Sequence, residues 1–280
     1  MRVIQVAMMF AGILFFAGLL AFQRNPVSVE GYLDEERTIR YVGGQGREDP
    51  DNTGVAINWQ QGETDPTKIQ AKMEHYVEAS RKVGKELLKK GVKRFYLGVV
   101  FRRYVAPEEF VQIVRETDMQ VQNYAVRGTL PEIDPTMRYS FFGGPSEHAL
   151  IETRAIENAL AQMKHSAKES KADKLAAQRT GNPDAEGDEE FTPEEIRDIP
   201  LNENDVVLNG VYTFEAITDA EGYRKIRNHP AVYHVDVTAT YVYEQIKDRV
   251  SWENFFERAF NLTGYHTFWD MENIGLDKFQ

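Results

Sequence analysis

The residues best suited to chemistry in this sequence are His234 and Asp236, which lie in the apolar run 232–237. Alternate side chains of an extended strand point to the same face, so the imidazole and the carboxylate would lie together. Such a pair could bind a metal ion or relay a proton. The competing interpretation is a hydrogen-bonded pair on the solvent side of an antiparallel sheet. The pattern therefore favours a purely structural pair, and a metal site that uses His234 and Asp236 is the alternative.

A second candidate metal site is a polar turn with Asp49, Asp51 and Thr53 before Gly54. This spacing resembles the first half of a calcium-binding loop with oxygen ligands. The position that should carry a bidentate glutamate holds Gln60, and no helix is expected on either side. The segment is therefore expected to be an ordinary turn, and a metal site that uses Asp49 and Asp51 is the alternative.

No motif of familiar enzyme chemistry occurs in the chain. It lacks a glycine-rich phosphate loop, a zinc-protease helix, a nucleophile elbow and a dinucleotide fingerprint. It also contains no cysteine, which excludes disulfides, thiolate nucleophiles and zinc–thiolate sites. The formal net charge of −11, from 44 acidic and 33 basic residues, opposes binding to a nucleic acid. We therefore expect no catalytic residue, no cofactor and no nucleic-acid partner.

The strand of His234 and Asp236 belongs to the second of two similarly arranged segments, at about 92–126 and 205–240. Each segment has an extended apolar run, a short helical pattern and a second extended run. Two βαβ units of this kind can form one antiparallel sheet with both helices on one face. We therefore predict an α+β fold with a ferredoxin-like core. In that core the first strands of the two units are central neighbours.

The helices that would hold these strands have starts encoded in the sequence. Pro107 suits the first position of one helix, because proline lacks the amide that would have no partner there. Thr218 and Glu221 have the spacing of a capping box at the start of the other helix. A third helix should begin after Asp65 and end at Gly91, with apolar residues along one stripe.

The N-terminal segment is apolar and uncharged from Val3 to Phe22, between Arg2 and Arg24. As a helix it is long enough to cross the hydrocarbon core of a bilayer. We predict a retained anchor or signal-anchor over residues 1–24 that contacts membrane lipid through residues 3–22. A cleaved signal peptide and a buried soluble helix are the alternatives. A very short basic N-terminal end favours a body outside the cytoplasm, for example in a periplasm.

The rest of the chain divides by composition. Residues 25–64 are rich in turn-forming side chains and predict a tether with one short strand. Residues 65–280 predict the globular α+β body, interrupted by an insertion over 127–204. The insertion has a helical middle, and about 180–198 it is acidic enough to predict a flexible loop.

Together these patterns predict a single-pass protein of the cell membrane with an extracytoplasmic body. We expect a non-enzymatic binding or regulatory module that acts through a partner protein. A structural accessory subunit of a larger membrane complex is the second hypothesis, and a hydrolase without a recognisable motif is the third. The aromatic C-terminal tail should either complete the core or present a docking surface.

Overall fold

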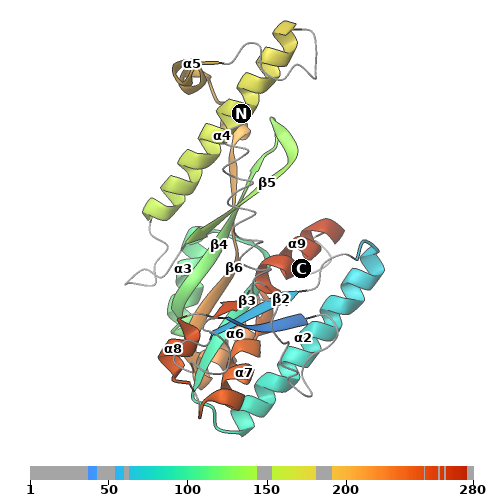
Figure 1. The fold of residues 1–280 in the computed structure, drawn as a ribbon, viewed down its shortest axis with the longest axis vertical. Helices are drawn as coiled ribbons and strands as arrows, with labels where there is room; N and C mark the ends of the chain where they lie inside the picture. The colour runs from blue at the N-terminus through green and yellow to red at the C-terminus, as the bar shows by residue number, and fades with distance from the viewer. Residues whose placement is uncertain are drawn as a thin grey trace. The chain divides into compact units, whose positions relative to one another are not determined.

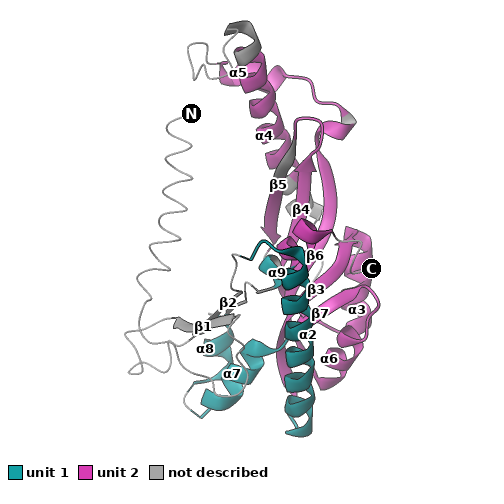
Figure 2. Ribbon diagram, turned by 90° about the vertical axis from the view of Figure 1, so that its right-hand side faces the viewer, with its two compact units in different colours: residues 1–92, 236–267 teal, residues 93–235, 268–280 magenta. Residues whose placement is uncertain are grey.

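The computed structural model describes residues 37–42, 54–59, 63–143, 153–180, 191–248, 250–257, 259–261 and 263–275. Its contacts divide the chain into two compact units (Figure 2), residues 1–92 with 236–267 (unit 1) and residues 93–235 with 268–280 (unit 2). The described part combines helices and strands and contains a five-stranded antiparallel sheet. The prediction of a mixed fold with an antiparallel sheet is therefore confirmed. That residues 65–280 form one body stays a prediction.

Unit 1 is built around helix α2 (Pro66–Lys89). The Asp65 side chain accepts a hydrogen bond of 2.9 Å from the Thr67 amide and caps the helix start. The helix ends before Gly91, whose φ of 76° places it in the left-handed region that glycine adopts without a penalty. Both boundaries agree with the prediction from sequence.

Unit 1 also contains a three-stranded sheet in the order β1-β2-β8. Its strands are β1 (Arg37–Val42), β2 (Gly54–Trp59) and β8 (Phe260–Asn261). The predicted short strand of the tether is confirmed as β2, whereas β1 had no clear signal in the sequence. Helices α7 (Thr238–Ile246) and α8 (Trp252–Phe256) complete the unit, and their rings pack together. This aromatic cluster consists of Tyr243, Trp252, Phe255 and Phe256.

Unit 2 contains the five-stranded sheet, in the order β5-β4-β6-β3-β7 (Figure 1). Its strands are β3 (Arg94–Val105), β4 (Gln120–Leu130), β5 (Asp134–Gly143), β6 (Val207–Asp219) and β7 (Val232–Asp236). The first strands of the two predicted segments, β3 and β6, are adjacent and antiparallel. Val99 pairs with Phe214, and Val105 pairs with Val211. The predicted proximity of two strands more than a hundred residues apart is therefore confirmed.

Helices α3 (Pro107–Thr117) and α6 (Ala220–Arg227) connect the strands of each segment. They cover one face of the sheet, where the Phe101 ring lies 6.2 Å from the Phe110 ring of α3. Pro107 occupies the first turn of α3 as predicted. The predicted capping box of α6 is wrong, because Asp219 is the cap and accepts from the amides of the next turn. The Thr218 hydroxyl instead donates to the carbonyl of Asp118 at the end of α3.

The insertion begins as part of the sheet, which its composition did not indicate. β4 continues beyond residue 126 and pairs antiparallel with β5, so residues 127–143 form a hairpin. Helix α4 (Thr153–Thr180) confirms the helical middle of the insertion and packs on this hairpin. The packed cluster consists of Leu130, Ile133, Met163 and Ala167. Gly128 makes room for it, because a Cβ there would lie 2.2 Å from the Met163 side chain.

The last part of the acidic run is helical, which corrects the prediction of a flexible loop through residue 198. Helix α5 (Pro193–Asp198) begins with a capping box in which Thr192 and Glu195 bond reciprocally. The Lys168 ammonium of α4 donates to the Arg197 carbonyl, and Lys171 pairs with Asp205. The end of the acidic run and the connection that follows it are therefore attached to α4 by charge-assisted hydrogen bonds.

Three predicted features lie wholly or mainly outside the described residues: the apolar segment Val3–Phe22, the turn of Asp49 and Asp51, and residues 181–190 of the acidic run. Within the described ranges, no helix combines the length and apolar character that crossing a bilayer requires.

Candidate functional site

The predicted pair His234 and Asp236 lies on β7, where all five residues are buried. The expectation that the pair faces solvent is therefore wrong. Asp236, the last residue of β7, belongs to unit 1, as its two partners do. Its carboxylate accepts a hydrogen bond of 2.7 Å from the Thr238 amide and another from the Tyr76 hydroxyl. In the part of the chain that the structure describes, no three His, Cys, Asp or Glu side chains gather as a metal site. The assignment of metal ligands to these residues stays a prediction.

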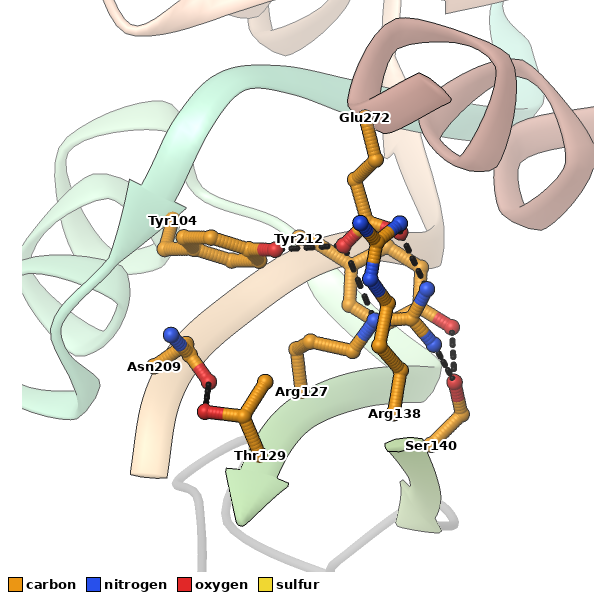
Figure 3. A network of polar contacts seen from close by, with 8 residues as sticks. All are labelled: Tyr104, Arg127, Thr129, Arg138, Ser140, Asn209, Tyr212 and Glu272. Carbon is orange, nitrogen blue, oxygen red and sulfur yellow. Dashed lines mark hydrogen bonds and ion pairs between the residues drawn. The ribbon is translucent and has the colours of Figure 1, made fainter. Parts of the chain in front are cut away.

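The most connected group of charged side chains in unit 2 is centred on Glu272 of helix α9 (Thr263–Ile274) (Figure 3). Arg127 of β4 donates to both carboxylate oxygens, from Nε at 2.9 Å and from Nη2. Arg138 of β5 donates from Nη1 at 3.3 Å, and the Tyr104 hydroxyl of β3 donates to Oε1. The side chains of Arg127 and Glu272 are 6% and 2% exposed, so this is a buried ion pair.

The third guanidinium nitrogen of Arg127 also has a partner. Its Nη1 donates to the Ser140 hydroxyl oxygen at 2.5 Å, and the Tyr212 hydroxyl donates to the same oxygen at 3.0 Å. The guanidinium carbon lies 5.5 Å from the ring centre of Tyr212 and 5.8 Å from that of Trp269. Cation–π contacts at these distances favour the charged form. The guanidinium is thus held by a carboxylate, a hydroxyl and two rings.

A shift in strand register places Tyr212 in this network. β4 residues Ala125 and Val126 pair with Thr213 and Val211, so β6 contains one extra residue, Tyr212, at this point. In a regular strand, residues two positions apart point to the same face. A bulge between them turns their side chains toward opposite faces. Phe214 lies 5.1 Å from Phe110 of α3, whereas Tyr212 lies 4.9 Å from Phe268 of α9.

Gly210 makes the adjacent irregularity possible. It pairs with Arg127 and has a φ of 130°, a region that side chains rarely adopt. A Cβ at this position would lie 2.5 Å from the carbonyl oxygen of Val105. Only glycine therefore allows β3 and β6 to approach this closely beneath Arg127.

The network shifts the protonation equilibria of its members. Burial and the hydrogen bond to Glu272 raise the pKa of Tyr104 far above its ordinary value. Burial, the largest single influence, lowers the pKa of Arg127, but the hydrogen bond and charge of Glu272, together with the nearby Tyr212 and Tyr104, outweigh burial and raise that pKa. Burial also raises the pKa of Tyr212. Both tyrosines therefore stay neutral and Arg127 stays charged at neutral pH.

This arrangement is suited to holding a helix rather than to catalysis. Glu272 accepts four hydrogen bonds, from Tyr104, Arg138 and twice from Arg127, which fills the usual capacity of a carboxylate. A carboxylate bound in this way is a poor base and a poor nucleophile. The network instead fixes the C-terminal part of α9, residues 268–274, on the sheet face opposite α3 and α6.

The shifted tyrosines predict a loss of stability at high pH. A tyrosine whose pKa is raised in the folded state stabilises that state fully below the unfolded pKa of about 10, and the contribution is lost as the pH rises above it. The free energy of unfolding, measured by urea titration, should therefore fall from about pH 9.5 upward. Tyr104→Phe should reduce that slope, because it removes one such group. An unchanged slope in the variant would show that Tyr104 is not shifted.

A second buried carboxylate lies on β6. Glu215 is 4% exposed and accepts from the Tyr96 hydroxyl at 2.6 Å and from the Asn123 amide. All three residues belong to unit 2. Two neutral donors thus bind this carboxylate, and the three side chains form a second polar cluster in unit 2.

The sequence analysis did not identify Arg127, Glu272 or Tyr104. A local signal existed, since Arg127 is the one charged residue in the buried run Tyr124–Leu130 and Glu272 follows an aromatic stretch. A charge within a buried strand requires a counterion, but its partner lies 145 positions away and no local pattern reveals it.

Comparison with known proteins finds no family model, no curated protein and no solved structure that matches this chain.

Proposed function

We propose that this chain is a membrane-anchored, extracytoplasmic binding or regulatory module that acts through a partner protein and catalyses no reaction. The apolar run from Val3 to Phe22 supports the anchor, because twenty such residues suffice to cross a bilayer as a helix.

One observation carries the non-enzymatic part of this proposal. The best-connected ionisable cluster of the described chain, around Glu272, uses its hydrogen-bonding capacity within the fold. Arg127, its buried arginine, is bound by Glu272 and Ser140, and Tyr104 and Tyr212 are neutral. A site that binds a substrate needs groups that remain available to it. This cluster instead stabilises the scaffold, which suits a protein whose work is recognition.

We propose further that unit 2 is a ferredoxin-like core with added elements. Its two segments, β3-α3-β4 and β6-α6-β7, contribute to a sheet in which β4, β6, β3 and β7 follow one another. This is the strand order expected of two βαβ units that share a sheet with their first strands in the centre. β5 extends the sheet beyond β4. The fold supports many functions, so it does not by itself select one.

The location is tested with the full chain fused at its C-terminus to a reporter that is active only outside the cytoplasm. The reporter should give a signal, and the protein should stay in the membrane fraction after a high-salt wash, because an apolar helix of this length is not released by salt. Release of a shortened soluble chain that begins near Phe22 would show a cleaved signal peptide. An inactive reporter would place the body in the cytoplasm.

The function is tested by size-exclusion chromatography of the fragment from Gly31 onward. A binding module should give a folded, monomeric fragment. Aggregation, or constant copurification with other proteins, would favour the structural accessory subunit instead. A catalytic turnover detected with the purified fragment would contradict both.

A further inference from the structure

The last strand of the five-stranded sheet, β5, has a side that pairs with no strand of the described chain. The other side of β5 pairs with β4 along most of the strand, from the pair of Gly143 with Tyr124 to the pair of Asp134 with Leu130. The amide and carbonyl groups that alternate with the paired ones point away from β4. A row of such groups is a template on which an extended segment of another protein can add a strand.

The side chains of β5 give this edge two different faces. Tyr139 and Phe141 stack at 6.1 Å and pack against the cluster beneath α4. The alternating residues Arg138, Ser140 and Phe142 lie on the other face, where Ser140 and Arg138 join the Glu272 network (Figure 3). Phe142 is 64% exposed, a large value for an aromatic side chain. This face of the edge therefore offers an apolar surface four positions from a guanidinium.

The charges of this face are not balanced within the network. Two guanidinium groups, of Arg127 and Arg138, meet the single carboxylate of Glu272. Arg127 holds that carboxylate with two bonds, whereas Arg138 contributes one contact of 3.3 Å and its side chain is 41% exposed. Arg138 can therefore bind a second carboxylate while Arg127 keeps Glu272 in place. In a chain with a net charge of −11, this local excess of positive charge selects for an acidic ligand.

We infer that β5 binds an extended acidic segment of a partner protein, which adds a sixth strand to the sheet. The segment carries a carboxylate opposite Arg138 and an apolar side chain opposite Phe142, so the two are four positions apart in the partner. The main chain supplies hydrogen bonds, and the two side chains supply selectivity. This inference rests on the proposed function as a protein-binding module, and it names the surface and the chemistry of the partner.

The test uses the full chain in detergent and two labelled peptides of about ten residues that alternate valine with threonine. One peptide carries a glutamate with a leucine four positions away on each side, so that it fits either strand direction, and the other carries lysine in place of the glutamate. Fluorescence anisotropy should show the glutamate peptide binding about tenfold more tightly, because it forms a charge-assisted hydrogen bond with Arg138. Hydrogen exchange of the β5 amides should slow in the complex.

Two variants and a control identify the surface. Arg138→Gln should remove the preference for glutamate over lysine, and Phe142→Ala should weaken both peptides about fivefold, since each loses its apolar contact. Arg115→Gln, at an exposed position of α3, should change neither affinity. Phe142 is exposed enough that its replacement leaves folding intact, so this variant is informative even if Arg138→Gln folds poorly.

Equal affinity for the two peptides, no binding, or slowed exchange only outside β5 would overturn the inference. These outcomes are separate from the location and size-exclusion tests. A chain that passes those tests and fails here is a binding module that uses another surface. A chain that fails those tests and still binds the glutamate peptide through β5 keeps the site but needs a different biological role.

Discussion

Glu272→Gln should lower the free energy of unfolding by about 3–5 kcal/mol. The substitution removes the carboxylate charge and leaves the guanidinium of Arg127, which is 6% exposed, buried without a counterion. Urea unfolding followed by tryptophan fluorescence measures the loss. In hydrogen exchange, the loss of amide protection should be largest in residues 268–274, the part of α9 that the network holds.

An exposed ion pair provides the matched control. Arg103 and Glu109 approach to 2.6 Å, but their side chains are 47% and 35% exposed, so Glu109→Gln should cost at most about 1 kcal/mol. The double variant Arg127→Met with Glu272→Met should recover most of the loss, because an apolar pair of similar volume needs no counterion. If Glu272→Gln costs no more than Glu109→Gln, the network is solvated and does not clamp α9.

Phe101→Ala should destabilise unit 2 by about 3–5 kcal/mol, as expected for a fully buried ring. Phe101 has no exposed surface, and its ring lies 5.5 Å from Phe214 on β6 and 6.2 Å from Phe110 on α3. The residue therefore joins elements of both βαβ segments. Calorimetry or urea unfolding gives the size of the effect. Phe142→Ala, at a ring 64% exposed, should change stability by about 0.5 kcal/mol or less.

Val211→Asp extends the same test to the second segment. Val211 is fully buried and pairs with Val105, so the new carboxylate would lie in the sheet without a partner. Hydrogen exchange in β3 and β6 should then accelerate together, since the two strands share one core. If only the segment that carries the substitution loses protection, the two halves are independent and the shared core is wrong.

The sequence by itself determined the local structure of this protein. The start of α2 at Asp65, its end at Gly91 and the proline at the start of α3 follow from the hydrogen-bonding needs and backbone preferences of single residues. The two strand–helix–strand segments, and the adjacency of β3 and β6, follow from apolar periodicity and from the need to bury both sheet faces. The helix boundaries depend only on residues that are neighbours in the sequence. The adjacency of β3 and β6 could be predicted because few arrangements of two βαβ units bury both sheet faces.

Only the tertiary structure decided which charges meet and which faces they occupy. Alternation assigns Tyr212 and Phe214 to the same side of β6, but the extra residue in the pairing with β4 turns Tyr212 toward α9. The partner of Arg127 is a glutamate on the C-terminal helix, brought near it by the packing of that helix on the sheet. Strand register and the counterion of a buried charge are set by contacts between distant segments, whose identity no local periodicity encodes.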